Sequence, residues 1–402
     1  MGRILALKSA RNLKTGYYVI EGMNSFGTVY YAYYLFFFMQ HQFGFDNKKN
    51  LMLSAAYGAI YMVGSWLGGR FGQRFGFFNA LKIGFVMMAG ALLMGTRLHS
   101  ATGQICVMAG MVMGMCLTWP TLEALVSEGE TPVTLPRCIG IYNLVWAGTG
   151  ALSFFIGGTM LDKLGPQSIF YVPATVFILE LALIFYLESR AGQPEADRDK
   201  EGSRTLEAQV PELNPRPIAR ARVFLRMAWL ANPFAYIAIN SLVAFVPGLA
   251  TKFGLSAMFA GFVCSVWCFA RLAAFFALWM WPGWHYRFRW LLLAYLTLII
   301  SFVSILAAPN LFLLVVMQIA LGGALGLIYY SSLFYSMETT DKKGEHGGIH
   351  EAAIGLGNFA GPAMGAASLH FLPNHANSGA LGVGLMLVAG LVGLLAVRRF
   401  GN

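Results

Sequence analysis

The chain has 402 residues and a formal net charge of +10, yet only 11% of its residues are charged and 57% are hydrophobic. Soluble domains carry about 25% charged residues, so this composition excludes an ordinary soluble globular protein and indicates a polytopic membrane protein. The five cysteines all fall in or beside apolar stretches, which argues against a disulfide framework.

Twelve apolar stretches are each long enough to form a membrane-spanning helix, which needs about 20 residues. In chain order, we predict spans at 16–39, 51–69, 79–98, 103–126, 138–160, 167–187, 225–249, 256–280, 289–308, 311–336, 348–372 and 378–397. The segment before the first span is basic but has no compact apolar region, so we expect no cleavable signal peptide. The predicted fold class is therefore an all-α membrane protein with twelve transmembrane helices.

The longest polar stretch separates the sixth predicted span from the seventh. Its first half is rich in charged residues and its second half in proline, which is the composition of a solvated linker. We therefore predict an N-terminal six-helix half at 1–189, a cytoplasmic linker at 190–222 and a C-terminal six-helix half at 223–402. The alternative is that the linker binds a partner.

The distribution of basic residues indicates the side of the membrane on which each loop lies. With the N-terminus placed in the cytoplasm, most of the 28 Lys and Arg residues fall in cytoplasmic segments, in agreement with the positive-inside rule. We therefore expect both termini in the cytoplasm and a location in the bacterial inner (plasma) membrane. Since topology explains the basic excess, we expect no nucleic-acid partner.

Glycine spacing suggests that the two halves are copies of one another. Gly110 and Gly114 in the fourth span correspond to Gly322 and Gly326 in the tenth. Similar glycine spacings recur in the fifth and eleventh spans. Internal repeats of this kind are typical of secondary transporters, and together with the six-plus-six division they predict two pseudo-symmetric halves.

The loop between the second and third spans reads G-R-F-G-Q-R-F-G-F-F, beginning at Gly69. It resembles the G-x-L-x-D-R-x-G-R-[RK] motif of the major facilitator superfamily, and the resemblance to this family covers nearly the whole chain. Gly69, Arg74 and Gly76 match the motif, whereas glutamine replaces its acid. In the family, this loop helps to hold the cytoplasmic side closed through charge contacts. The resemblance implies the same role here, but without the contact that the acid would make. Alternatively, Arg70 and Arg74 only anchor the helix end at lipid phosphates.

A second glycine motif lies in the eleventh span, where Gly357, Gly361 and Gly365 recur every four residues. This spacing places them on one helix face, where a neighbouring backbone can approach closely. The motif resembles a glycine-rich signature associated with antiporters of the family. The resemblance implies tight packing between the halves and a bend at Pro362. The direction of transport stays open.

A few titratable residues enter the predicted spans, where ionisable groups are costly and mark functional sites. They are Glu21, Glu123, Arg271, His350 and Glu351. The family resemblance turns Glu21 and Glu123 toward a central cavity and places the other three near its wall. We predict that Glu21, and after it Glu123, carries a proton or binds a cationic substrate, with Arg271 and His350 as charge partners.

Each of these predictions has an alternative. Glu123 and Glu351 would pair with surface cations if their role were only to close the cytoplasmic gate. Glu180, in the sixth span, is interpreted as a structural residue on a peripheral helix. Arg271 is the hardest to explain as structural, because an unpaired arginine deep in an apolar span costs at least about 2.5 kcal/mol.

Aromatic and amide side chains supply the candidate substrate-binding surface. Such groups offer flat stacking faces with hydrogen-bonding tips, suited to a sugar, a nucleoside or an amphipathic organic molecule. The residues we assign to substrate binding are Asn24, Trp119, Asn143, Trp146, Tyr330 and Tyr335. The alternative for many of the tyrosines is an aromatic belt at the membrane interface.

The sequence thus predicts a proton-coupled secondary active transporter that moves a small organic solute by alternating access. It has no phosphate-binding loop, zinc-site spacing or nucleophile elbow, so we expect neither an enzyme nor a bound cofactor or metal. The expected partners are the lipid bilayer, the small-molecule substrate and protons, and we expect a monomer. Alternatives are an efflux pump for lipophilic or cationic compounds, a lipid flippase and a non-transporting membrane sensor.

Overall fold

Helices make up nearly all of the part of the chain that the structure describes. This computed structural model describes residues 2–130, 134–191, 215–338, 343–375 and 377–400. The helices in chain order are α1 (Gly2–Phe43), α2 (Asn47–Phe75), α3 (Phe77–Gly95), α4 (Ala101–Ser127), α5 (Leu135–Leu164), α6 (Ser168–Ala191), α7 (Pro215–Lys252), α8 (Ala257–Cys264), α9 (Val266–Met280), the short 3-10 helix η2 (Pro282–Trp284), α10 (Phe288–Ala307), α11 (Leu311–Glu338), α12 (Lys343–Phe371) and α13 (Ser378–Phe400). Since α8 and α9 follow one another directly across Ser265, they form one span, and the predicted all-α fold class is confirmed.

Ten of the helical spans are long and apolar enough to cross a membrane by composition alone. Helices α1 and α12 are not among the ten. Both carry buried polar residues in mid-helix, including Glu21 and Asn24 on α1 and Glu351 and Asn358 on α12. These residues lower the hydropathy of the two helices. Other helices, such as α4 with Glu123 and α9 with Arg271, also bury polar groups but are apolar enough elsewhere to meet the criterion.

Local sequence explains where several helices begin. The Asp46 side chain accepts a hydrogen bond from the Lys49 backbone amide (2.8 Å) and caps α2, and Ser100 caps α4 in the same way. Gly76, between α2 and α3, has a φ of +92°, which favours glycine over any residue with a side chain. This explains why the family motif keeps a glycine at that position.

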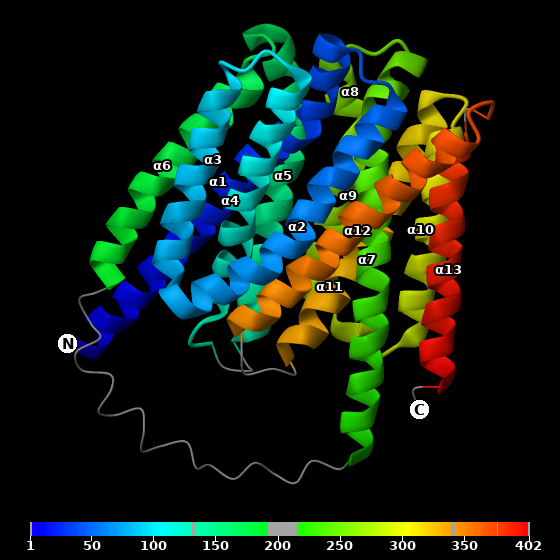
Figure 1. Cartoon of the computed structure of the whole chain (residues 1–402). Coiled ribbons are helices and arrows are strands. Elements are labelled where there is room, and N and C mark those ends of the chain that lie inside the picture. Colours follow the sequence, from blue (N-terminus) through cyan, green and yellow to red (C-terminus); the bar gives the residue numbers. More distant parts are fainter. Residues whose placement is uncertain (1, 131–133, 192–214, 339–342, 376, 401–402) are drawn as a thin grey trace.

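The helices form two groups that meet along the middle of the bundle (Figure 1). Within the first group α1 packs on α5 and α6, and α3 on α4 and α6; within the second, α9 and α10 pack on α11, and α7 on α12. The groups meet where α2 lies beside α12 and where α5 packs on α8 and α9. The start of α1 and the end of α13 lie at the same end of the bundle, which we call the terminal end.

Both ends of the segment predicted as a linker, 190–222, are helical. Helix α6 ends at Ala191 and helix α7 begins at Pro215, so the last residues assigned to the linker are helical. The remaining residues of that prediction, 192–214, lie outside the described residues. Whether the linker binds a partner therefore stays a prediction.

Glycines determine how closely α12 approaches its neighbours. The sequence motif implied that Gly357 and Gly361 pack against the other half, but they do not. Gly357 and Gly361 contact the α7 backbone, within the same half, since a Cβ on Gly361 would lie 2.6 Å from the Ile237 carbonyl oxygen. The close approach to α2, in the other half, is made by Gly348 and Gly355. These two are seven residues apart and face a different direction from Gly357 and Gly361. Helix α12 continues unbroken across Pro362.

Candidate functional site

A cavity of about 120 Å³ lies between the two groups of helices. Its wall combines side chains from both halves, most of them aromatic or able to form hydrogen bonds. The lining residues are Ser25, Thr28, Val29, Ala32, Tyr33, Tyr57, Tyr61, Met115, Trp119, Trp146, Gly150, Tyr236, Ile239, Asn240, Arg271, Tyr329, Glu351, Ile354 and Asn358. A cavity enclosed by both halves is the arrangement expected for a site that alternates its access.

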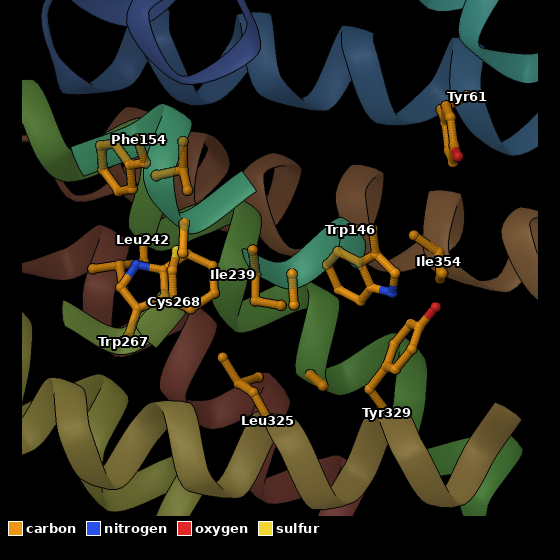
Figure 2. Packing of buried hydrophobic residues seen from close by; sticks show 14 of the residues in the cluster. Tyr61, Trp146, Phe154, Ile239, Leu242, Trp267, Cys268, Leu325, Tyr329 and Ile354 are labelled. Atoms are coloured by element: carbon orange, nitrogen blue, oxygen red, sulfur yellow. The ribbon is translucent and has the colours of Figure 1, made fainter. Parts of the chain in front are cut away.

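Trp146 on α5 is the central aromatic residue of this wall. Its ring packs edge-to-face on Tyr329 of α11, with 5.2 Å between ring centres, and on Trp119 of α4, with 6.4 Å. Figure 2 shows Trp146 and Tyr329 facing each other from separate helices. The Trp146 Nε1–H donates a hydrogen bond to Asn143 Oδ1 (3.1 Å), which fixes the orientation of the indole. A flat apolar surface is thereby held rigidly in the wall.

Arg271 on α9 is buried in the same wall, with only 6% of its surface exposed. Its guanidinium carbon lies 4.5 Å from the ring centre of Trp146 and 4.9 Å from that of Trp267. Among the described residues, no carboxylate lies within ion-pair distance of it, and its Nε has no hydrogen-bond partner. The positive charge is therefore held by aromatic rings, with no acidic partner.

A cluster of acidic residues lies beside the cavity, toward the terminal end. Glu351 of α12 lines the cavity and accepts a hydrogen bond from the Tyr61 hydroxyl of α2 (2.6 Å). Glu123, His350 and Glu351 each bring one oxygen or nitrogen atom to a common point, and these three atoms lie within 4.8 Å of one another. Glu21 of α1 lies close enough to interact electrostatically with Glu123 and Glu351. We call these four residues the carboxyl cluster.

The carboxyl cluster has unused hydrogen-bonding capacity. Both carboxylate oxygens of Glu21 and of Glu123, and both ring nitrogens of His350, are buried without a partner among the described residues. One imidazole and two carboxylates could supply three ligands to a cation, or the same groups could hold and release protons. Sequence spacing could not reveal this grouping, because Glu123 comes from α4 and the other two potential ligands from α12.

The predicted substrate-binding residues divide into two groups. Trp119 and Trp146 line the cavity, as expected. Asn24 and Asn143 are buried behind the wall, where Asn24 Nδ2 donates a weak hydrogen bond to Thr118 (3.4 Å) and Asn143 accepts from Trp146. The last two predicted residues, Tyr330 and Tyr335, also lie outside the wall.

Tyr330 and Tyr335 instead pack around Trp284, with ring centres 5.6 and 6.0 Å from its own. The Tyr335 hydroxyl also accepts a hydrogen bond from the backbone amide of Tyr286 (2.9 Å). Both tyrosines therefore support the region around η2. Neither tyrosine lines the cavity, so their positions do not favour direct contact with a substrate there.

Some residues of the site were not anticipated. Tyr57 and Tyr61 stack one helical turn apart on α2, with 6.1 Å between ring centres and 11° between planes, and both line the cavity. Asn240 and Asn358 form a hydrogen bond that joins α7 to α12 in the wall. Glu180 on α6, which we interpreted as structural, is fully buried with both oxygens unpartnered. Tyr57 and Tyr61 had a four-residue aromatic spacing as their sequence signal, and Glu180 stood out as an ionisable residue in a predicted span.

The two halves touch at both ends of the bundle. At the terminal end, Gly348 of α12 lies against Gly69 of α2, and Gly140 of α5 faces the Trp279 ring. At the opposite end, Asp162 of α5 accepts a hydrogen bond from the Met258 backbone amide (3.0 Å) in the first turn of α8. These contacts join the halves at both ends of the bundle. Separating the halves at either end requires one set to break.

A helical bundle of two halves, with a cavity between them that is lined by aromatic and hydrogen-bonding side chains, defines a class of protein, the membrane transporters built from two helical halves. The model of the Major Facilitator Superfamily matches residues 18–362, and this chain belongs to that family. Gly69 of its loop motif lies at the contact between α2 and α12.

Solved structures with the same fold include transporters of two kinds. The nucleoside transporter NupG is 13% identical, covers 96% of this chain and 99% of its own, and superposes with a TM-score of 0.69. The human organic anion transporter MFSD10 (TETRAN) is 12% identical, with coverage of 96% and 99% and a TM-score of 0.70. No curated protein matches the sequence. At this identity the likeness establishes the fold alone.

Proposed function

We propose that this protein is a secondary active transporter that moves a small organic solute by alternating access of the central cavity, driven by protons. The observation that carries the proposal is the cavity itself. Its wall is drawn from both halves and contains Glu351, which belongs to the carboxyl cluster. A solute in the cavity would therefore contact both halves and lie beside groups that can exchange protons.

The character of the wall supports an organic solute. Trp146, Tyr329 and Tyr57 provide stacking faces, and Asn240, Ser25 and neighbouring hydroxyls provide hydrogen-bonding tips. The two structural relatives named above carry nucleosides and organic anions, both organic molecules with planar or charged parts. A pump for cations would have to tolerate Arg271 in the wall.

The carboxyl cluster supports coupling to protons. Glu123 belongs to the first half and Glu351 to the second, so a change in the packing of the halves changes their separation. Two ionised carboxylates this close repel one another, and a shared proton removes that repulsion. Closure at the terminal end would favour holding the proton, and separation of the halves there would favour its release. Glu21 and His350 are the neighbouring groups through which the proton would pass.

The test is proton movement in proteoliposomes that contain a pH-sensitive dye. Uridine, glucose, benzoate and tetraphenylphosphonium are each added outside, to wild-type protein and to Glu351→Gln. We expect at least one solute to move protons with the wild-type protein and not with the variant. Binding of a solute without any flux would instead favour a membrane sensor. If Zn²⁺ or Na⁺ is required for flux, the cluster couples to a cation other than the proton.

A further inference from the structure

In the part of the chain that the structure describes, the charge of Arg271 has no acidic partner. The residue lies one to two helical turns beyond Ser265, where α8 gives way to α9, and it is buried in the cavity wall. Burying an arginine in the membrane interior costs at least about 2.5 kcal/mol unless the charge is compensated. Among the described residues the compensation comes from the faces of Trp146 and Trp267.

The two tryptophans leave much of the guanidinium unused. Contact with an aromatic face is worth about 0.5–2 kcal/mol, but it does not satisfy N–H donors. A guanidinium carries five such donors in a rigid fork that matches the two oxygens of a carboxylate or phosphate. At least the Nε–H of Arg271 is buried without a partner. The structure thus presents an oriented anion-binding group with no anion among the described side chains.

The one acidic residue of the cavity wall does not fill this role. Glu351 accepts a hydrogen bond from Tyr61 on α2 and belongs to the carboxyl cluster. Its carboxylate is not within ion-pair distance of Arg271. Tyr33, Tyr236 and Cys268 are near enough to Arg271 to interact with it electrostatically, and none of them is an acidic residue. No described side chain therefore supplies a negative charge to Arg271, and a bound ligand could do so.

We propose that the transported solute is a small organic acid with a planar body, and that Arg271 binds its acidic group. The ring of Trp146 contacts both the guanidinium and Tyr329, so a planar group bound beside Arg271 would lie on that surface. The ligand would join the halves, since Trp146 belongs to the first and Arg271 to the second. This inference rests on the proposed function and narrows its substrate to aromatic or otherwise planar carboxylates and phosphates.

The experiment uses the full chain in detergent and follows ligand binding through quenching of tryptophan fluorescence. The probes are benzoate, its neutral analogue benzamide, the non-planar cyclohexanecarboxylate, phenyl phosphate and lysophosphatidic acid. We expect the wild-type protein to bind benzoate or phenyl phosphate more tightly than benzamide and cyclohexanecarboxylate. If only lysophosphatidic acid binds, the planar-acid assignment is overturned and an anionic lipid headgroup takes its place.

Two variants and a control test the role of Arg271 itself. Arg271→Gln should weaken binding of the planar acid by about tenfold or more and leave benzamide unchanged, because it removes a charged hydrogen-bond donor. Arg271→Lys should be intermediate, since it keeps the charge without the fork. Lys82→Gln, far from the cavity wall, is the control and should bind like wild type. Equal affinity of Arg271→Gln and the wild type for the acid would overturn the proposal.

The same measurements keep this inference separate from the proposed function. Transport of a neutral or cationic solute, without binding of planar acids, would overturn the inference and leave the transporter. Tight binding of benzoate that depends on Arg271, with no flux in proteoliposomes, would support the planar-acid site and overturn the proposed transport. A folding defect in Arg271→Gln would be visible as a lowered melting temperature without ligand, and Arg271→Lys then decides the question.

Discussion

Two partly exposed ion pairs lie within the first half of this protein, whereas the charged residues beside the cavity between the halves form no ion pair among the described residues. Lys82 of α3 and Glu188 of α6 form an ion pair in the first half, with 2.9 Å between Nζ and Oε1. Lys14 forms another with Glu130. Although partial burial acts to raise the pKa of the Glu130 carboxyl, the hydrogen bond and charge of Lys14 outweigh it and hold that pKa below its usual range.

Arg271 and the carboxyl cluster show the opposite arrangement. The protein places a cation and several acids in one buried region, yet Arg271 contacts aromatic rings and Glu351 contacts a tyrosine. A buried pair would neutralise both charges and hold the halves in one state. Charges kept apart remain free to bind a ligand and a proton. We expect the pairs to stabilise a half, and we propose that the separated charges serve transport.

The largest expected effect comes from removing the carboxylate of the cavity wall. Glu351→Gln keeps an acceptor for the Tyr61 hydroxyl but cannot exchange a proton, so uptake driven by a pH gradient should be abolished. Exchange of labelled for unlabelled solute, which needs no net proton movement, should persist. The matched control is Glu188→Gln, a paired carboxyl that should leave uptake unchanged. Gradient-driven uptake by Glu351→Gln would contradict the coupling role.

A second prediction concerns stability without ligand, where the two kinds of charge should respond with opposite signs. Arg271→Gln removes a buried cation that has no acidic partner, and we expect the free energy of unfolding to rise by about 1 kcal/mol. Lys82→Gln removes half of an ion pair and should lower it by up to about 1 kcal/mol. Chemical denaturation in detergent measures both. If both variants lower the free energy of unfolding equally, the charge of Arg271 stabilises the fold as an ion pair does, and the prediction is wrong.

A third prediction addresses the support of the aromatic surface. Asn143 accepts the hydrogen bond of the Trp146 indole, and Asn143→Ala should cost about 1 kcal/mol, or roughly fivefold in the affinity for a planar solute. Asn79→Ala is the control, because Asn79 makes a comparable hydrogen bond to the Phe75 carbonyl oxygen at an exposed position. Fluorescence titration distinguishes them. An unchanged affinity in Asn143→Ala would show that Trp146 needs no such support.

The smallest effect is expected where the carboxylate of Asp162, in one half, caps a helix of the other half. Asp162 contacts the first turn of α8, so Asp162→Ala should weaken closure at that end by about 0.5 kcal/mol. Hydrogen exchange should increase in both α5 and α8. Asp46→Ala, which removes a cap within α2, should affect only the start of that helix. Faster exchange confined to α8 in Asp162→Ala would mean that the contact does not hold the halves together.

Much of the fold was predictable because lipid leaves little choice: apolar stretches of sufficient length must be helices, and basic loops indicate their direction. The charged residues of the site were predictable for the same reason, since Glu21, Glu123, Arg271 and Glu351 stand out against apolar surroundings. Which of them meet was suggested by depth along the helices. The family resemblance, not the spacing, then placed their helices beside one another.

The finer features were not predictable, because they depend on helix rotation. Tyr329 and Tyr330 are neighbours in sequence, but about 100° of rotation separates them, and only Tyr329 lines the cavity. Likewise the glycine spacing at Gly357 and Gly361 revealed a face for close packing without showing that α7 would occupy it. Tyr57 and Tyr61 look like ordinary core aromatics until the partners of α2 are known. Tertiary packing alone distinguishes these cases.

The most direct test of the central claim is uptake of labelled benzoate into proteoliposomes under an imposed pH gradient, compared between wild-type protein and Arg271→Gln. The account predicts accumulation by the wild type that follows the gradient, and little or none by the variant at the same reconstituted amount. Equal accumulation by both would contradict it, because the unpaired charge of the cavity would then have no part in holding the solute.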